Sequence, residues 1–176
     1  SNFILSLKLS PPYSMFDDVD DYSSLSDQEK YEWVEYYKWK FKATWFSPFT
    51  EKLVLATKTE FGFLGAYNEQ LGVSPFERFY MGGSGLTGFN IDGREIIPLR
   101  GFKEANSNNV VYEGDGINGG VGAIKYTFEL RYPISLEQQA TIYALAFAEA
   151  GNTFSSLRQF DPFDAKKAAG MGIRLY

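Results

Sequence analysis

The side chains that this chain could use for chemistry are carboxylates, lysines, tyrosines and serines, because its 176 residues include no His and no Cys. A Ser-His-Asp triad, a thiol nucleophile and a zinc finger all need residues that it lacks. The G-x-G-x-x-G pattern of Gly83–Gly88 precedes Phe89-Asn90-Ile91-Asp92-Gly93, which is not the amphipathic helix that a dinucleotide site requires. We therefore predict no enzymatic activity and no cofactor.

The acidic stretch 13–32 is the segment to test for metal binding. Asp18, Asp20 and Glu29 have a superficial calcium-loop spacing, but Ser23 stands where such a loop needs glycine. A solvated acidic loop is the simpler interpretation, and divalent-ion binding stays open. The net charge of −5 and the isoelectric point near 4.8 argue against nucleic-acid binding, since no basic stripe could displace counterions from phosphates.

One long glycine-rich loop contains the candidate functional residues. The loop spans about 76–120, and a loop of this length is usually either functional or disordered. We predict that it is functional. Its candidate residues are Gly82, Gly83, Leu99, Arg100, Gly101 and Phe102.

The segments on either side of this loop alternate between apolar and polar residues with a period of two. This alternation predicts strands near 1–10, 33–46, 53–64, 122–132, 140–150 and 167–176. The clearest case is 37–45, where the aromatic residues fall on one side and Lys38, Lys40 and Lys42 fall on the other. We predict short turns at Ser47–Thr50 and Pro133–Gln139, and a second long loop at Asn152–Lys166.

The chain has no stretch of about 20 apolar residues that could form a spanning helix. It begins directly with an alternating segment, so we expect any targeting sequence to lie outside it. Strands of about ten residues joined alternately by short turns and long loops instead match a transmembrane β-barrel. Aromatic residues make up 18% of the chain, as expected where side chains meet both lipid and water.

In such a barrel the apolar sides of the strands face lipid and the charged sides face a wet lumen. A soluble ligand-binding β-barrel would have the opposite polarity, and it is one alternative. About six strands would leave unpaired edges in a wide barrel. We therefore predict an all-β fold, in which residues 1–176 form part of an antiparallel transmembrane β-barrel.

Five short motifs follow one another in a fixed order along the chain. They are Phe79-Tyr80-Met81-Gly82-Gly83, Leu99-Arg100-Gly101-Phe102, Gly119-Gly120, Phe128–Pro133 and Phe147–Asn152. This ordered set resembles the BamA-like outer-membrane assembly and transport superfamily, and the resemblance covers nearly the whole chain. More narrowly, Gly83-Ser84-Gly85-Leu86 and the inserted Gly93-Arg94-Glu95 are similar to those of Bacteroidetes-type assembly factors.

The resemblance implies that the chain is strands nine to fourteen of a sixteen-stranded barrel in the outer membrane of a Gram-negative bacterium. The other strands and the periplasmic domains would lie outside this chain. The implied function is the assembly and insertion of outer-membrane β-barrel proteins, and a related polypeptide-transport pore is the alternative. The implied partners are nascent β-barrel proteins, accessory lipoproteins, membrane lipid and lipopolysaccharide.

The resemblance also implies that the loop folds back into the lumen, where Arg100 pairs with Glu129 and Glu149. The alternation independently places Glu129 on the charged side of its strand, and an arginine fork suits carboxylate partners. Glu149 shares a side with three bulky residues of its strand. We expect it to face inward, because a carboxylate on the lipid face would cost up to a few kcal/mol. A solvated Arg100 is the alternative.

Overall fold

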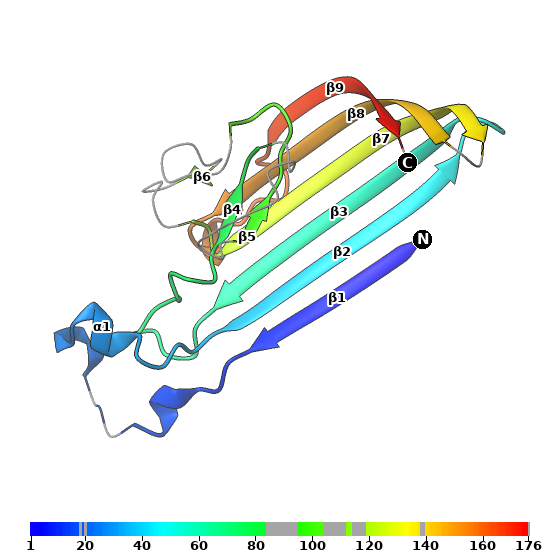
Figure 1. Ribbon diagram of the computed structural model, residues 1–176. Coiled ribbons are helices and arrows are strands. Elements are labelled where there is room, and N and C mark those ends of the chain that lie inside the picture. Colours follow the sequence, from blue (N-terminus) through cyan, green and yellow to red (C-terminus); the bar gives the residue numbers. More distant parts are fainter. Residues whose placement is uncertain are drawn as a thin grey trace.

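The computed structural model describes every residue except 18, 20, 84–94, 104–111, 114–118, 138–139 and 176. Its main body is one curved antiparallel sheet of six long strands (Figure 1). The strands are β1 (Asn2–Leu9), β2 (Tyr37–Pro48), β3 (Val54–Gly65), β7 (Gly122–Glu137), β8 (Ala140–Phe154) and β9 (Lys166–Leu175). Each pairs with the next in this order, and the sheet is not closed. The predicted all-β antiparallel fold is confirmed, and an open sheet is what part of a barrel would give.

The shorter elements lie at one end of the sheet or against one of its faces (Figure 1). β4 (Phe79–Met81) and β5 (Glu95–Ile97) form a parallel pair, and β6 (Tyr112–Glu113) runs parallel to the end of β8. The helical turns are η1 (Tyr13–Met15), η2 (Tyr22–Ser24), α1 (Asp27–Lys30) and η3 (Leu157–Gln159). In the described part of the chain, no helix is long and apolar enough to cross a bilayer.

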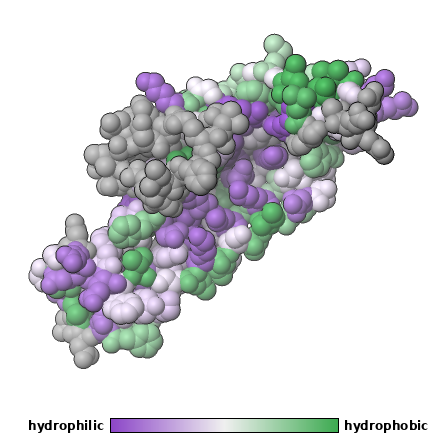
Figure 2. Space-filling view, in the orientation of Figure 1, coloured by the Kyte–Doolittle hydropathy of each residue, from purple (hydrophilic) through white to green (hydrophobic). Residues whose placement is uncertain are grey.

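The two faces of the sheet have opposite polarity. On β2 the charged Lys38 is 1% exposed, whereas its neighbour Trp39 is 42% exposed. The same side of the sheet exposes large apolar residues on the other strands, among them Phe3, Leu5, Phe128, Met171 and Ile173. We call this the outer face. The inner face is concave, bears β4 and β5, and shows hydrophilic side chains along its middle (Figure 2). A soluble ligand-binding barrel would need the reverse polarity, so that alternative does not fit.

Four predicted boundaries are wrong. The turn predicted at Ser47–Thr50 begins only after Pro48, because Ser47 and Pro48 still pair with β3. The strand predicted at 33–46 begins at Tyr37, because the preceding residues pack on the loop that follows β1: Glu35 accepts hydrogen bonds from the Ser14 backbone and hydroxyl at 2.9 and 3.0 Å. Of the turn predicted at Pro133–Gln139, residues 133–137 are instead the end of β7, and 138–139 lie outside the described residues. Pro133 has no N–H to donate, and the pairing register shifts between Pro133 and Ser135. The loop predicted from Asn152 begins only after Phe154.

The core lies between the inner face and the β4–β5 pair. One cluster joins Leu64 and Ala123 of the wall to Phe79 and Val121, and a second joins Met81 to Leu99. The side of β4 that faces the wall is therefore apolar, and burial of its side chains stabilises the loop against the sheet.

Candidate functional site

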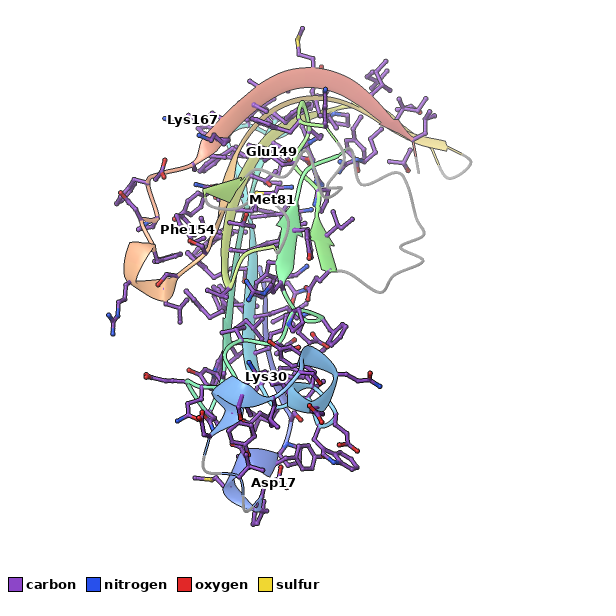
Figure 3. The ribbon with its side chains drawn as sticks, turned by 90° about the vertical axis from the view of Figure 1, so that its left-hand side faces the viewer. Asp17, Lys30, Met81, Glu149, Phe154 and Lys167 are labelled. Carbon is purple, nitrogen blue, oxygen red and sulfur yellow. The ribbon has the colours of Figure 1, made fainter. Side chains whose placement is uncertain are left out.

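Glycines in the inner wall make room for the side chains of β4. A Cβ atom added at Gly62 would lie 2.5 Å from the Phe79 ring, and one at Gly151 would lie 2.7 Å from the Met81 sulfur. Phe79 and Met81 are both fully buried. Figure 3 shows β4 and β5 on the inner side of the sheet, with Met81 and Glu149 in the same region. Phe79 and Met81 of the loop thus occupy the space that Gly62 and Gly151 leave in the wall.

The tip of the loop, Leu99–Phe102, follows this docked pair. Leu99 is fully buried beside Met81, while the Gly82 N–H donates to the Ile97 carbonyl at 3.0 Å and the Gly83 N–H donates to the Phe102 carbonyl at 3.3 Å. Gly101 has a φ of +84°, a conformation that favours glycine, and a Cβ there would lie 3.4 Å from the Ala168 Cβ. The tip therefore lies close to β9.

Arg100 contacts both carboxylates that the sequence analysis named. Its Nη2 donates to Glu129 Oε1 at 3.0 Å and to Glu149 Oε1 at 2.7 Å, and its backbone N–H donates to Glu149 Oε2 at 3.0 Å. The two carboxylate side chains are 3% exposed and that of Arg100 is 24% exposed. Glu129 lies on β7 and Glu149 on β8, so one guanidinium joins two adjacent strands. Glu149 faces inward, together with the buried Leu145.

Three further cations complete what we call the arginine cluster. Lys125 lies 3.2 Å from Glu149, and Glu129 accepts from Arg131 at 2.6 Å and from Arg174 at 3.2 Å. Four cations thus surround two carboxylates. The sequence analysis did not identify these three as partners. In the sequence Lys125 and Arg131 alternate with apolar residues as Glu129 does, but alternation alone does not show which charges meet.

The Phe147 ring lies under Arg100 and fixes the plane of its guanidinium group. The guanidinium carbon lies 3.5 Å from the centre of the Phe147 ring, within the range of a cation–π contact. The ring lies over Gly170 of β9, where an added Cβ would be 2.8 Å from the Phe147 Cζ. Sequence reasoning missed both residues, since an inward aromatic residue and a glycine opposite it have no meaning until the strand pairing is known.

A second charge cluster, also missed, holds the start of the loop. The fully buried Lys38 ammonium lies 3.1 Å from the Glu77 carboxylate, 2.7 Å from the Glu95 carboxylate and 2.7 Å from the Glu77 carbonyl oxygen. It also lies 4.5 Å from the centre of the Phe79 ring. We call this the lysine cluster. It ties β2 to the residue pair at one end of the parallel β4–β5 pair, since Glu77 precedes β4 and Glu95 begins β5.

The charges of the lysine cluster act on the pKa of Glu95. Burial would raise the pKa of this carboxyl group, but the hydrogen bonds and positive charges of Lys38 and Lys40 outweigh burial and lower it below 4.5. Glu95 is therefore ionised at neutral pH, as an ion pair with Lys38 requires.

The contacts of the two clusters give this region a positioning role. Among the residues that the structure describes, no group of three His, Cys, Asp or Glu residues could hold a metal ion. Asp18 and Asp20 of the suggested calcium spacing, and Ser84–Arg94 of the glycine-rich pattern, lie outside the described residues. What the two clusters can do is fix the loop against the wall by charge and by shape.

The comparisons with known proteins agree with this fold. The family model described as the Omp85 superfamily domain matches residues 24–176, which is most of the chain. Among curated proteins, none matches the chain.

Proposed function

Because the chain belongs to the Omp85 superfamily, we propose that the full-length protein assembles and inserts β-barrel proteins into the outer membrane. The superfamily consists of outer-membrane β-barrel proteins of Gram-negative bacteria that insert or transport proteins. The finer proposal is a Bacteroidetes-type assembly factor related to BamA. Its function is not enzymatic.

The observation that carries the proposal is the contact of Arg100 with Glu129 and Glu149 at 3.0 and 2.7 Å. Through it the loop, β7 and β8 become one unit, and Arg174 adds β9 at 3.2 Å from Glu129. A region of the wall that is held together by these contacts is compatible with a barrel that opens between other strands. In our proposal an unpaired strand edge at the opening accepts incoming strands by β-addition, and the bilayer is thinned beside it.

The partners follow from this mechanism. We propose that nascent outer-membrane β-barrel proteins bind at the opening, that accessory lipoproteins bind the full-length protein, and that its outer face contacts membrane lipid and lipopolysaccharide. The apolar outer face supports the last of these, since Trp39 is 42% exposed and Met171 is 87% exposed.

Reconstitution tests the proposal. The full-length protein is placed in lipid vesicles, several unrelated urea-unfolded β-barrel proteins are added, and their folding is followed by heat-modifiable migration. We expect faster folding of every client than in empty vesicles, and slower folding with Arg100→Ala than with the matched Lys103→Ala variant. Equal folding with and without the protein would contradict an assembly function.

The same reconstituted vesicles distinguish an assembly factor from a dedicated transport pore. A dedicated pore would act on one substrate only, and deletion of residues 82–102 would raise the ion conductance of the barrel sharply, because the docked loop would no longer obstruct it. An assembly factor acts on many clients whatever its conductance.

A further inference from the structure

The segment between β8 and β9 folds onto the outer face of the sheet. We call residues 155–165 the outer strap; it includes η3 and lies on the opposite side of the sheet from β4 and β5 (Figure 3). The Phe160 ring centre lies 5.3 Å from that of Phe63 and 5.1 Å from that of Phe154. Leu157 lies 3.6 Å from where a Cβ of Gly122 would be. The strap is thus packed on β3, β7 and β8.

The strap hides outer-face residues that would otherwise meet the surroundings. Ile124 is fully buried, although the alternation of β7 predicts that it faces lipid. Its partner across the strands, Asn152, is also fully buried, and its amide donates to the Asp164 carbonyl of the strap at 3.1 Å. An amide in hydrocarbon without a hydrogen bond is costly. The strap therefore marks the level at which the lipid-facing band ends.

The strap also exposes its own apolar side chains. Phe163 is 87% exposed and Leu157 is 43% exposed. The Asp161 carboxylate accepts a hydrogen bond from the Phe163 N–H at 2.8 Å and so fixes this part of the strap. Isolated exposed aromatic residues of this kind are typical of the boundary between the acyl and polar layers of a membrane.

Two exposed cations lie on the strap and just after it. Ala168 approaches Gly101 on the inner face, so Lys167 belongs to the outer face, where Met171, Ile173 and Leu175 continue along β9. Arg158 is the exposed cation of the strap itself. Neither side chain forms an ion pair with any residue that the structure describes. β9 begins with lysines and continues with apolar outward residues, the order expected where a strand passes from the phosphate level into hydrocarbon.

We propose that the outer strap contacts the outer leaflet at the phosphate level, with Phe163 and Leu157 in the upper acyl layer and with Arg158 and Lys167 bound to lipid phosphates. This inference rests on the proposed membrane orientation of the outer face. Each cation near an anionic lipid surface is worth about a fivefold enrichment of such lipids. The strap then fixes the depth of β8 and β9 in the bilayer.

Site-specific quenching tests the depth. The chain has no Cys, so once any Cys outside it is replaced, Phe163→Cys gives a full-length protein that bimane labels at one position. Phosphatidylcholine vesicles then carry a nitroxide either high or low on the acyl chain. We expect the label at 163 to be quenched more by the shallow nitroxide, a label at Met171→Cys more by the deep one, and a label at the loop residue Glu69→Cys by neither.

The phosphate contact is tested with the same label. Nitroxide-labelled phosphatidylglycerol should quench position 163 more than nitroxide-labelled phosphatidylcholine, by up to about fivefold for each cation. Replacement of Arg158→Gln and Lys167→Gln should remove this preference. The matched control, Lys166→Gln, changes a lysine on the inward side of the alternation and should leave the preference unchanged.

The outcomes separate the two proposals. Quenching at 171 without quenching at 163 would overturn the strap contact and leave the membrane orientation intact. Absence of quenching at both positions would overturn the orientation and the strap contact together. Equal quenching by the two lipids would overturn the phosphate contact.

Discussion

Removal of the Arg100 side chain tests how the loop is held. In Arg100→Ala the backbone N–H that donates to Glu149 at 3.0 Å remains, while the two ion pairs and the contact with Phe147 are lost. Neither carboxylate is left alone, because Glu129 keeps Arg131 at 2.6 Å and Glu149 keeps Lys125 at 3.2 Å.

The remaining partners set the size of the effect. A buried charge that loses every partner costs about 3–5 kcal/mol. Two lost charge-assisted hydrogen bonds of about 1.5 kcal/mol each and a cation–π contact of about 1 kcal/mol give an upper value near this range. The Arg100 side chain is 24% exposed, which weakens its interactions through solvent screening. We therefore expect the loop to lose about 2–3 kcal/mol of docking free energy.

Hydrogen exchange measures this loss directly. The Gly82 and Gly83 amides bond to the Ile97 and Phe102 carbonyls, so their protection reports the opening of the loop. We expect Arg100→Ala to lower their protection by about 30- to 150-fold, since about 1.4 kcal/mol is tenfold. The matched variant Lys103→Ala should change it by less than about twofold. A change below about threefold in Arg100→Ala would refute the reasoning.

Three further perturbations test other parts of the account. Gly170→Ala should weaken loop docking by about 1–3 kcal/mol, because the new Cβ would lie 2.8 Å from the Phe147 ring. The control Gly172→Ala should change little, since its nearest atom lies at 3.9 Å. Hydrogen exchange of the loop amides compares the two variants, and equal effects would contradict the role of the Phe147 ring under Arg100. Lys38→Met should lower the free energy of unfolding by about 2–3 kcal/mol, because it removes the buried ammonium between Glu77 and Glu95. The control Lys8→Ala should lower it by less than about 0.5 kcal/mol, since Lys8 lies 3.9 Å from Glu77 and its side chain is 52% exposed. Urea unfolding of the full-length protein measures both, and an effect of Lys38→Met as small as that of Lys8→Ala would contradict the role of the lysine cluster. The pKa of Glu95 is lowered in the folded state, so its contribution is fully present above the unfolded pKa near 4.5 and is lost as the pH falls through the folded pKa; protection factors of Gly82 should fall on acidification below about pH 4.5, and a Glu95→Gln variant with the same acid response would exclude Glu95 as the cause.

Strand polarity could be predicted from the sequence where the two sides of a strand differ clearly. On β2, lysines and aromatic residues alternate without exception from Tyr37 to Phe41, and Lys38 and Trp39 have the exposures that this pattern predicts. On β8 the pattern is ambiguous, since Leu145 and Phe147 share the inner side with Glu149. The reason is physical: an inner face covered by a docked loop need not be polar, and Leu145 is only 8% exposed.

Contacts between distant segments could not be predicted from alternation. Ile124 has the position of a lipid-facing residue but is fully buried, and its cross-strand neighbour Asn152 bonds to a strap that begins 31 residues after Ile124. Arg174 is a charge among the apolar residues at the end of β9, and its partner Glu129 lies 45 residues away. The Arg100 contacts were expected only because of a family resemblance. No resemblance indicated the lysine cluster. Its residues could not be predicted as partners, because they meet only where β4 and β5 dock against β2.

A disulfide between the loop tip and β9 tests the central claim, that the loop lies docked on the inner wall. A Cβ at Gly101 would lie 3.4 Å from the Ala168 Cβ, close to the separation in a disulfide, and the chain has no other Cys. With Gly101→Cys and Ala168→Cys in the full-length protein, the account predicts that the cross-link forms under mild oxidation in the membrane and that assembly activity is retained. Failure of the cross-link, with both single variants folded and reactive to thiol reagents, would contradict the account.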